Sequence, residues 1–282
     1  MSFGKNVKAM KNPNARLDLG DQIRTPVYTE KAPRNEQVTF SANVGQTEWY
    51  PPLMIAADYM SRQIVNETRL AEAISLMERI NPDDYTNYLN GFYRAGLTRF
   101  GKAWPYADIV TTLMGLSEIL KPTNYLEIGV RRGRSVCAVV SRAPEVNLYM
   151  FDMWINNYAG MENPGEAFVD SELEKFGHSG ERRYVNGNSH ETIAPFLADN
   201  PELWFDIITV DGDHSTYGAI DDLCDVLPRL KVGGAIVFDD ICHPAHPGLK
   251  DVWQRLLCDD DRFSAASFNE IGYGVGFAIR KW

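Results

Sequence analysis

Acidic residues gather where an apolar run of the sequence gives way to a helical pattern. The stretch FDIITVDGDHSTYGAIDDL, residues 205–223, has Asp211 at the end of its apolar run. A later run, AIVFDD, ends in Asp239 and Asp240. Like charges crowded at neighbouring strand ends are destabilising, so we expect a divalent cation bound by these three carboxylates. Hard oxygen ligands without a soft donor favour Mg²⁺, with Mn²⁺ or Ca²⁺ as alternatives. The competing interpretation is that each aspartate caps a helix or is solvated.

A candidate general base lies in the same stretch. His214 follows Asp211 by three residues, at the start of the next helical pattern, so its ring can lean over the same pocket. Histidine is the side chain most often used to move protons near neutral pH. Asp213 stands between the two, either as a further polar contact or as a solvated residue.

A glycine turn follows the first apolar run of this region. In YLEIGVRRGRS, residues 125–135, a strand pattern leads through Gly129 and Gly133 into a helix start. Such turns bring backbone N–H groups close to a ligand at the end of a parallel strand. The spacing differs from G-x-G-x-x-G, so NAD and FAD are disfavoured.

Further polar residues end the next two strand patterns. Asp152 follows Gly129 by 23 residues, where a carboxylate can accept both ribose hydroxyls of an adenosine ligand. Asn188 and Ser189 follow the third pattern and can contact an adenine edge. Taken singly, Asp152 could cap a helix, and the other two could be turn residues.

Short apolar runs alternate with helical patterns beyond residue 121, which is typical of βαβ units with a parallel sheet. We expect an α/β fold with seven strands, at NYLEIG, NLYMFD, RYVNG, FDIITVD, AIVFDD, FSAASF and GYGVGFAIR. Upstream, apolar spacing predicts one helix around residues 70–77 and another around residues 109–120. The segment between them, residues 90–106, is rich in aromatic and basic residues without a clear period, and we expect a loop there.

Composition narrows the class of protein. The 282 residues are 44% hydrophobic and carry a net charge of −10, which predicts a folded globular chain that does not bind nucleic acid. No apolar run is long enough for a membrane span, and the first residues lack the apolar core of a signal peptide. We therefore expect no membrane association and a cytoplasmic location. The four cysteines form no C-x-x-C pair, so neither a disulfide framework nor a cysteine zinc site is indicated.

The chain divides into three expected parts. Residues 1–45 are polar and predict an extended N-terminal arm. Residues 46–105 form a helical extension, and residues 106–282 form the α/β domain. An arm of this kind can wrap a neighbouring subunit, so we expect a homo-oligomer.

From about residue 106 onward the sequence resembles the class I S-adenosylmethionine-dependent methyltransferases. The resemblance rests on LEIGVRRGRS, FDMW, NGNSHET, VDGDHSTYGAIDDL and LKVGGAIVFDD, and is greatest to metal-dependent macrolide and sugar O-methyltransferases and cephalosporin-hydroxylase-like proteins. It implies a Rossmann-like, mostly parallel seven-stranded sheet with helices on both faces.

The resemblance also implies roles for individual residues. Glu127 and the loop from Gly129 through Gly133 to Ser135 would hold the methionine part of the cofactor. Asp152 would bind the ribose, and Asn188 with Ser189 the adenine, although related proteins often carry an acid at the position of Asn188. The residues implied as metal ligands are Asp211, Asp239 and Asp240, and His214 is implied as the general base.

These features predict an O-methyltransferase that uses S-adenosylmethionine and Mg²⁺ and acts on a hydroxyl of a small polyhydroxylated molecule, such as a sugar moiety or a natural product. Neighbouring hydroxyls suit the acceptor, because two oxygens can chelate one ion. Three rival hypotheses stay open: a metal-independent methyltransferase, a non-catalytic subunit that binds an adenosine ligand, and a metal-dependent oxygenase or hydrolase.

Overall fold

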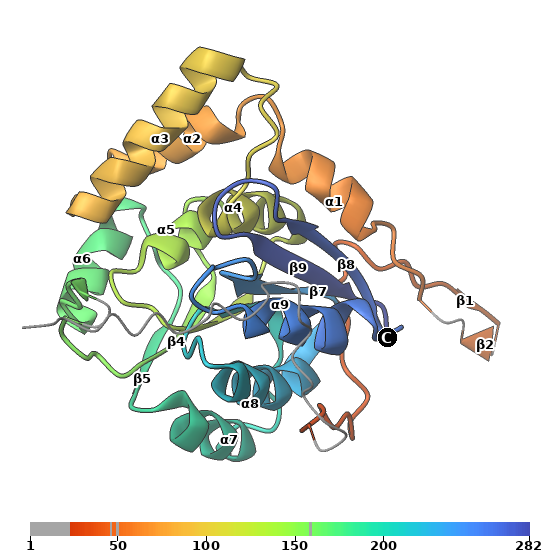
Figure 1. Cartoon of the computed structure of the whole chain (residues 1–282). Helices are drawn as coiled ribbons and strands as arrows, with labels where there is room; N and C mark the ends of the chain where they lie inside the picture. Colours follow the sequence, from red (N-terminus) through yellow and green to blue (C-terminus); the bar gives the residue numbers. More distant parts are fainter. Residues whose placement is uncertain (1–22, 46, 49–50, 158–159) are drawn as a thin grey trace, which may run out of the picture.

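The computed structural model of the chain describes residues 23–45, 47–48, 51–157 and 160–282. A seven-stranded sheet forms its centre, with helices packed on both faces (Figure 1). The strands of this sheet are β3 (Asn124–Ile128), β4 (Asn147–Asp152), β5 (Arg182–Asn186), β6 (Phe205–Val210), β7 (Leu230–Asp239), β8 (Phe263–Phe268) and β9 (Val275–Arg280). The helices are α1 (Ala57–Ile64), α2 (Arg69–Met77), α3 (Asp84–Phe100), α4 (Ile109–Leu120), α5 (Arg134–Val140), α6 (Glu166–Lys175), α7 (Ser189–Asp199), α8 (Thr216–Val226) and α9 (Gly248–Trp253). Short elements complete the described chain: β1 (Asn43–Val44), β2 (Thr47–Glu48), a 3-10 turn (Leu227–Arg229) and a π-helical turn (Gln254–Cys258).

The strand order is β5-β4-β3-β6-β7-β9-β8. Strands β3 to β7 run parallel, and β9 is antiparallel to both of its neighbours. The α/β fold with seven mostly parallel strands is therefore confirmed. Strand order reverses direction between β3 and β6, and ligands of such sheets bind beyond the carboxyl ends of the strands at this switch point.

The core lies on both faces of the sheet because successive strand residues point to opposite sides. On β6, Ile207 packs into the cluster that contains α4 and α5, whereas Ile208 and Val210 pack into the cluster that contains α7 and α8. Both clusters are buried, so the strands are apolar throughout rather than alternating. This explains why the strands stand out as short apolar runs in the sequence.

The loop expected over residues 90–106 is wrong, because α3 extends through most of it. The side chain of Asp83 accepts a hydrogen bond from the backbone N–H of Thr86 and caps the helix. Gly96 obscures the helical pattern, but its missing side chain has a packing role: a Cβ there would lie 1.8 Å from the Trp104 ring. Packing against Trp104 thus outweighs the low helix propensity of glycine.

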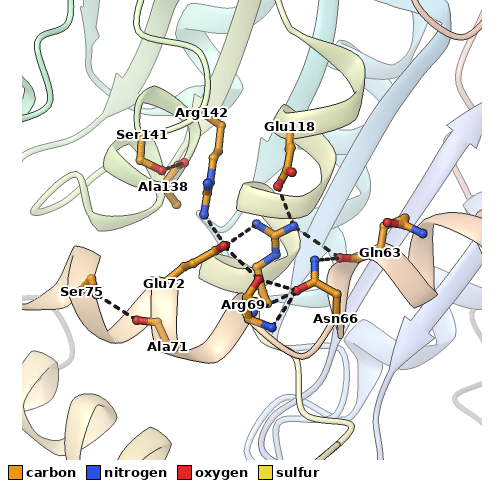
Figure 2. A network of polar contacts seen from close by, with 11 residues as sticks. Gln63, Asn66, Arg69, Ala71, Glu72, Ser75, Glu118, Ala138, Ser141 and Arg142 are labelled. Atoms are coloured by element: carbon orange, nitrogen blue, oxygen red, sulfur yellow. Dashed lines mark hydrogen bonds and ion pairs between the residues drawn. The ribbon is translucent and has the colours of Figure 1, made fainter. Parts of the chain in front are cut away.

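A buried arginine joins the upstream helices to the sheet domain, as Figure 2 shows. Arg69 on α2 is 2% exposed and pairs with Glu118 on α4 at 2.8 Å and with Glu72 at 3.1 Å. Glu72 in turn pairs with Arg142, which follows α5 (Figure 2). Since the surrounding apolar residues of α1 to α5 belong to one core cluster, the helical extension and the sheet share a core.

The described part of the predicted arm also contacts the sheet domain. Asn35 is buried and donates hydrogen bonds to the Leu120 carbonyl and to Asp206, both at 3.0 Å. Val38 is 2% exposed and belongs to the core. Residues 1–22 lie outside the described residues, and the division at residues 45 and 105 stays a prediction. None of the helices in the described ranges has the length and apolar character that a bilayer crossing requires.

Candidate active site

Sheet register brings the ends of β3, β6 and β7 side by side. Val210 is the register partner of both Ile128 and Phe238, so the residues that follow these three meet at one edge of the sheet. The backbone N–H of Asp211 donates to the Ile128 carbonyl at 3.0 Å, which continues the pairing one residue beyond β6. Asp211 and Asp239 therefore emerge from neighbouring strands at the switch point.

Two carboxylates and one imidazole converge at this edge. Nε2 of His214 lies 3.2 Å from Oδ1 of Asp211, and its Nδ1 lies 3.6 Å from Oδ2 of Asp240. One potential ligand atom from each of these residues lies within 4.8 Å of the other two, a spacing at which a single metal ion can contact all three. All three side chains are partly exposed, so the group is reachable from solvent.

The backbone at the end of β7 places Asp240 within this cluster. Side chains of consecutive strand residues point to opposite faces, so Asp239 and Asp240 would diverge if the strand continued. Asp240 instead has a φ of +56°, in the left-handed region that side-chain-bearing residues rarely adopt. Strain of this kind is concentrated at functional sites, where the surrounding structure holds it in place.

Charge repulsion shows in the acidity of these groups. Burial, together with the charges of Asp211 and Asp240, raises the pKa of Asp239 well above its usual value. Burial and the Asp211 charge raise the pKa of Asp240 to about 6. The hydrogen bond to Asp211 is the largest reason why the pKa of His214 is raised. Asp239, Asp240 and His214 thus have higher pKa values than isolated side chains, as expected for a site rich in negative charge and poor in positive charge.

The carboxylate of Asp239 is near this cluster but is not one of its three mutually close groups. The charges of Asp211 and Asp240 act on Asp239, whereas the described groups within 4.8 Å of one another are Asp211, His214 and Asp240. The structure therefore brings the predicted base together with two predicted ligands. Asp239 as a direct ligand stays a prediction.

The glycine turn after β3 packs directly against the end of β6. Gly129 has a φ of +91°, and a Cβ on it would lie 2.1 Å from the carbonyl oxygen of Asp211. Only glycine allows the two strand ends to approach so closely. Gly133 has a φ of +71°, and a Cβ there would lie 2.9 Å from Val169 on α6. Both predicted glycines are thus required by the local geometry.

Glu127 and Ser135 form one buried pair beneath the glycine turn. The Glu127 side chain is completely buried, and its carboxylate accepts hydrogen bonds from the hydroxyls of Ser135 and Tyr125. Burial outweighs these hydrogen bonds and raises the pKa of Glu127 to about 8. The predicted contact of both residues with the methionine part of a cofactor stays a prediction.

Asp152, at the end of β4, organises the loops around it. Its Oδ2 accepts from the backbone N–H of Arg131 at 2.7 Å, and its Oδ1 accepts from the backbone N–H of Trp154 at 2.6 Å and from the Asn163 side chain at 3.0 Å. A carboxylate can accept about four hydrogen bonds, so at least one position remains for a ligand hydroxyl. The long segment after β4 contains α6 and meets the glycine turn at this carboxylate. Tyr158 of that segment lies outside the described residues.

Asn188 and Ser189 start α7 beside the same edge. The Asn188 side chain caps the helix, accepting from the backbone N–H of His190 at 3.2 Å. This is the turn role considered as an alternative, and it leaves the side-chain amide N–H groups able to meet a ligand. Ser189 is the first residue of α7 and helps to lower the pKa of the buried Asp222, which is nevertheless raised to about 6 by burial.

Three functional candidates escaped the sequence reasoning. Arg131 and Arg134 flank the glycine turn, and Tyr85 lies beneath Arg134, whose guanidinium carbon is 4.7 Å from the ring centroid. The three arginines of VRRGRS were a visible signal, because arginine is a common ligand of carboxylate and phosphate groups. Tyr85 carried no signal of its own.

Comparison with known protein families gives a match over part of the chain. Residues 126–241 match the family Methyltransf_24, described as a methyltransferase domain. No curated protein matches the chain.

Two solved structures illustrate the fold likeness. TomG from Streptomyces achromogenes, an O-methyltransferase involved in tomaymycin synthesis, is 19% identical, with a TM-score of 0.49 over 72% of this chain and 92% of that one. CalS11, a calicheamicin methyltransferase, is 18% identical, with a TM-score of 0.48 over 85% of this chain and 99% of that one. Likeness at this level does not extend to substrate or metal.

Proposed function

We propose that the chain transfers the methyl group of S-adenosylmethionine to a hydroxyl of a small polyhydroxylated molecule, assisted by a divalent cation. The match of residues 126–241 to a family described as a methyltransferase domain supports this proposal. The observation that carries the proposal is the convergence of Asp211, His214 and Asp240 at the switch point of the sheet. This is the edge at which an α/β fold binds its ligands.

The donor groups fit a divalent cation. Asp211 and Asp240 supply carboxylate oxygens, the ligands that Mg²⁺ and Mn²⁺ prefer. Burial and neighbouring carboxylates together raise the pKa of Asp239 and Asp240, and a cation would relieve the part that comes from the neighbouring charges. With Asp239 as third ligand the set would be all oxygen and would favour Mg²⁺. With His214 as third ligand it would be mixed, which suits Mn²⁺ as well.

The residues around the glycine turn fit an adenosine-containing cofactor. Gly129 lets β3 end close against Asp211. Asp152 keeps acceptor capacity for ribose hydroxyls. Asn188 and Ser189 stand at the next strand end, where the adenine would lie. Glu127 and Ser135 would support the methionine part from below.

When bound, S-adenosylmethionine supplies an electrophilic methyl group, and a divalent cation supplies a positive charge that makes a nearby hydroxyl more acidic. The protein has to align the acceptor hydroxyl with that methyl group and remove the hydroxyl proton. In this proposal His214 accepts the proton, and Asp211 orients its imidazole through the hydrogen bond at Nε2. Neutralising the Asp211 charge would lower the pKa of His214 and free the ring to act as a base.

The experiment is incubation of the protein with a metabolite extract and S-adenosylmethionine that carries an isotopically labelled methyl group. Mass spectrometry then identifies any molecule that gains the label. Label on an oxygen of a polyhydroxylated compound is the expected result. Calorimetric binding of S-adenosylhomocysteine without any labelled product would favour the non-catalytic binding subunit. No binding at all would favour the oxygenase or hydrolase. The expected homo-oligomer and cytoplasmic location also stay predictions.

A further inference from the structure

Three arginines follow the end of β3, and they differ in how their charges are balanced. Arg132 is fully engaged: it pairs with Glu162 at 2.8 Å and Asp83 at 3.5 Å and donates to the Asn81 carbonyl at 3.2 Å. Its guanidinium also lies 4.3 Å from the centroid of the Phe168 ring. Arg132 therefore has a structural role between α6 and the start of α3.

Arg134 is engaged less than Arg132, although its charge also acts on Asp83. Within the described ranges it makes no hydrogen bond or ion pair, and its Nε is buried without a partner. Its guanidinium lies over the ring of Tyr85, 4.7 Å from the centroid, a contact that fixes the cation but satisfies none of its N–H groups. A buried guanidinium N–H without an acceptor is unfavourable, and a ligand oxygen is one group that can satisfy it.

Arg131 is only partly balanced. Its Nε donates to the Glu162 carbonyl at 3.2 Å, but one terminal nitrogen is buried without a hydrogen bond and lies 3.6 Å from Asp83. Burial and the neighbouring charge of Arg134 lower the pKa of Arg131. Two arginines with unused N–H groups thus lie close enough to repel each other.

Both arginines border the acidic edge. The charge of Asp211 acts on Arg131, and the charges of Asp239 and Asp240 act on Tyr85, beneath Arg134. Gly129, two residues before Arg131, packs against the backbone of Asp211, so the turn that carries both arginines lies beside the acidic edge. Since the whole chain carries a net charge of −10, an anionic molecule needs a local positive region of this kind to bind here.

We propose that Arg131 and Arg134 bind an anionic group, a carboxylate or a phosphoryl group, of the methyl acceptor. The inference rests on the proposed function. The guanidinium forks offer several donors that match the oxygens of such a group, and one anion placed between them would remove their mutual repulsion. The acceptor is then a polyhydroxylated acid, with its anion at the arginines and its reacting hydroxyl at the acidic edge.

The test separates the metabolite extract on an anion exchanger before incubation with the protein, a divalent cation and labelled S-adenosylmethionine. Label in the retained, anionic fraction is expected. Phosphatase treatment of that fraction distinguishes the two sources: loss of labelled product indicates a phosphoryl group, and its survival a carboxylate. Label confined to the unretained, neutral fraction would overturn the inference while leaving methyl transfer intact. No label in any fraction would count against the proposed function and with it the inference.

Variants of Arg134 then test whether this residue binds the anionic group of the acceptor. For the labelled acceptor, we expect Arg134→Gln to raise KM roughly tenfold or more, with a much smaller effect on kcat and an unchanged affinity for S-adenosylhomocysteine. Arg134→Lys, which keeps the charge but not the fork, should recover part of the loss. Arg62→Gln is the matched control, because Arg62 is 69% exposed on α1 and, among the residues that the structure describes, pairs only with Asp58. An equal loss of S-adenosylhomocysteine affinity in Arg134→Gln would assign the arginine to the cofactor carboxylate and overturn the inference.

Discussion

Nε2 of His214 lies 3.2 Å from Oδ1 of Asp211. This hydrogen bond orients the ring and is the largest reason why the pKa of His214 is raised. The same carboxylate is a predicted ligand of the cation, so protonation of His214 and binding of the cation should affect each other. A variant that weakens cation binding should therefore also change the pKa of His214.

Replacing the base tests its role. We expect His214→Gln to lower kcat/KM by about 10²- to 10⁴-fold and to remove the limb of the pH profile in which the rate rises as His214 loses its proton. The measurement is kcat/KM against pH for both proteins, with melting temperatures to confirm folding. A lowered rate with an unchanged pH profile would mean that another group accepts the proton.

Removing one carboxylate should separate cation binding from cofactor binding. We expect Asp240→Asn to weaken the affinity for Mg²⁺ or Mn²⁺ by roughly 10- to 100-fold or more, while S-adenosylhomocysteine binds as before. Titration calorimetry with each ligand gives both numbers. Asp58→Asn is the control, since Asp58 is 82% exposed and its one ion pair within the described part of the chain is with Arg62. Equal loss of both affinities would place Asp240 in the cofactor site instead.

Stabilisation by a cation should depend on pH. Because the folded-state pKa of Asp240 is raised to about 6 and that of His214 is also raised, their protonated forms stabilise the cation-free protein at low pH. This stabilisation is complete below the unfolded pKa values and is lost as the pH rises through the folded ones. A cation competes with these protons, so the rise in melting temperature on adding Mn²⁺ should be larger at about pH 7.5 than at about pH 5. Equal shifts at both values would show that the cation binds elsewhere.

The approach of β3 to β6 depends on one glycine. Gly129→Ala would place a Cβ 2.1 Å from the Asp211 carbonyl oxygen, so the strand ends have to separate. We expect a loss of roughly 2 to 4 kcal/mol in the free energy of unfolding, measured by denaturant titration. Gly101→Ala isolates the clash, because Gly101 also has a positive φ, +75°, but no atom within 4 Å of the added Cβ. Its loss should be only about 1 to 2 kcal/mol, and equal losses would contradict the packing argument.

The sheet was largely predictable because its strands are buried on both faces and appear as uninterrupted apolar runs. β4 and β8 match the predicted segments residue for residue. Helix α3 was missed because the packing of Gly96 against Trp104 involves a contact that the sequence pattern does not display.

The candidate site was predictable only in part. Polar residues at strand ends marked the edge, and parallel topology brought Asp211 and Asp240 together. No pattern in the sequence predicted the left-handed backbone at Asp240. The sequence therefore did not show that Asp240 would join Asp211 and His214 while Asp239 would not. Tyr85 and Arg134 meet only because α3 packs beside the glycine turn, a tertiary contact that no local pattern encodes.

The dependence of methyl transfer on a cation is the most direct test of the account. Turnover of labelled S-adenosylmethionine is measured with the identified acceptor, first with excess EDTA and then after addition of Mg²⁺ or Mn²⁺ beyond the chelator. We predict that transfer stops with EDTA and returns with the added cation, whereas S-adenosylhomocysteine binds equally in both conditions. An unchanged rate in EDTA would show that Asp211, His214 and Asp240 act without a metal.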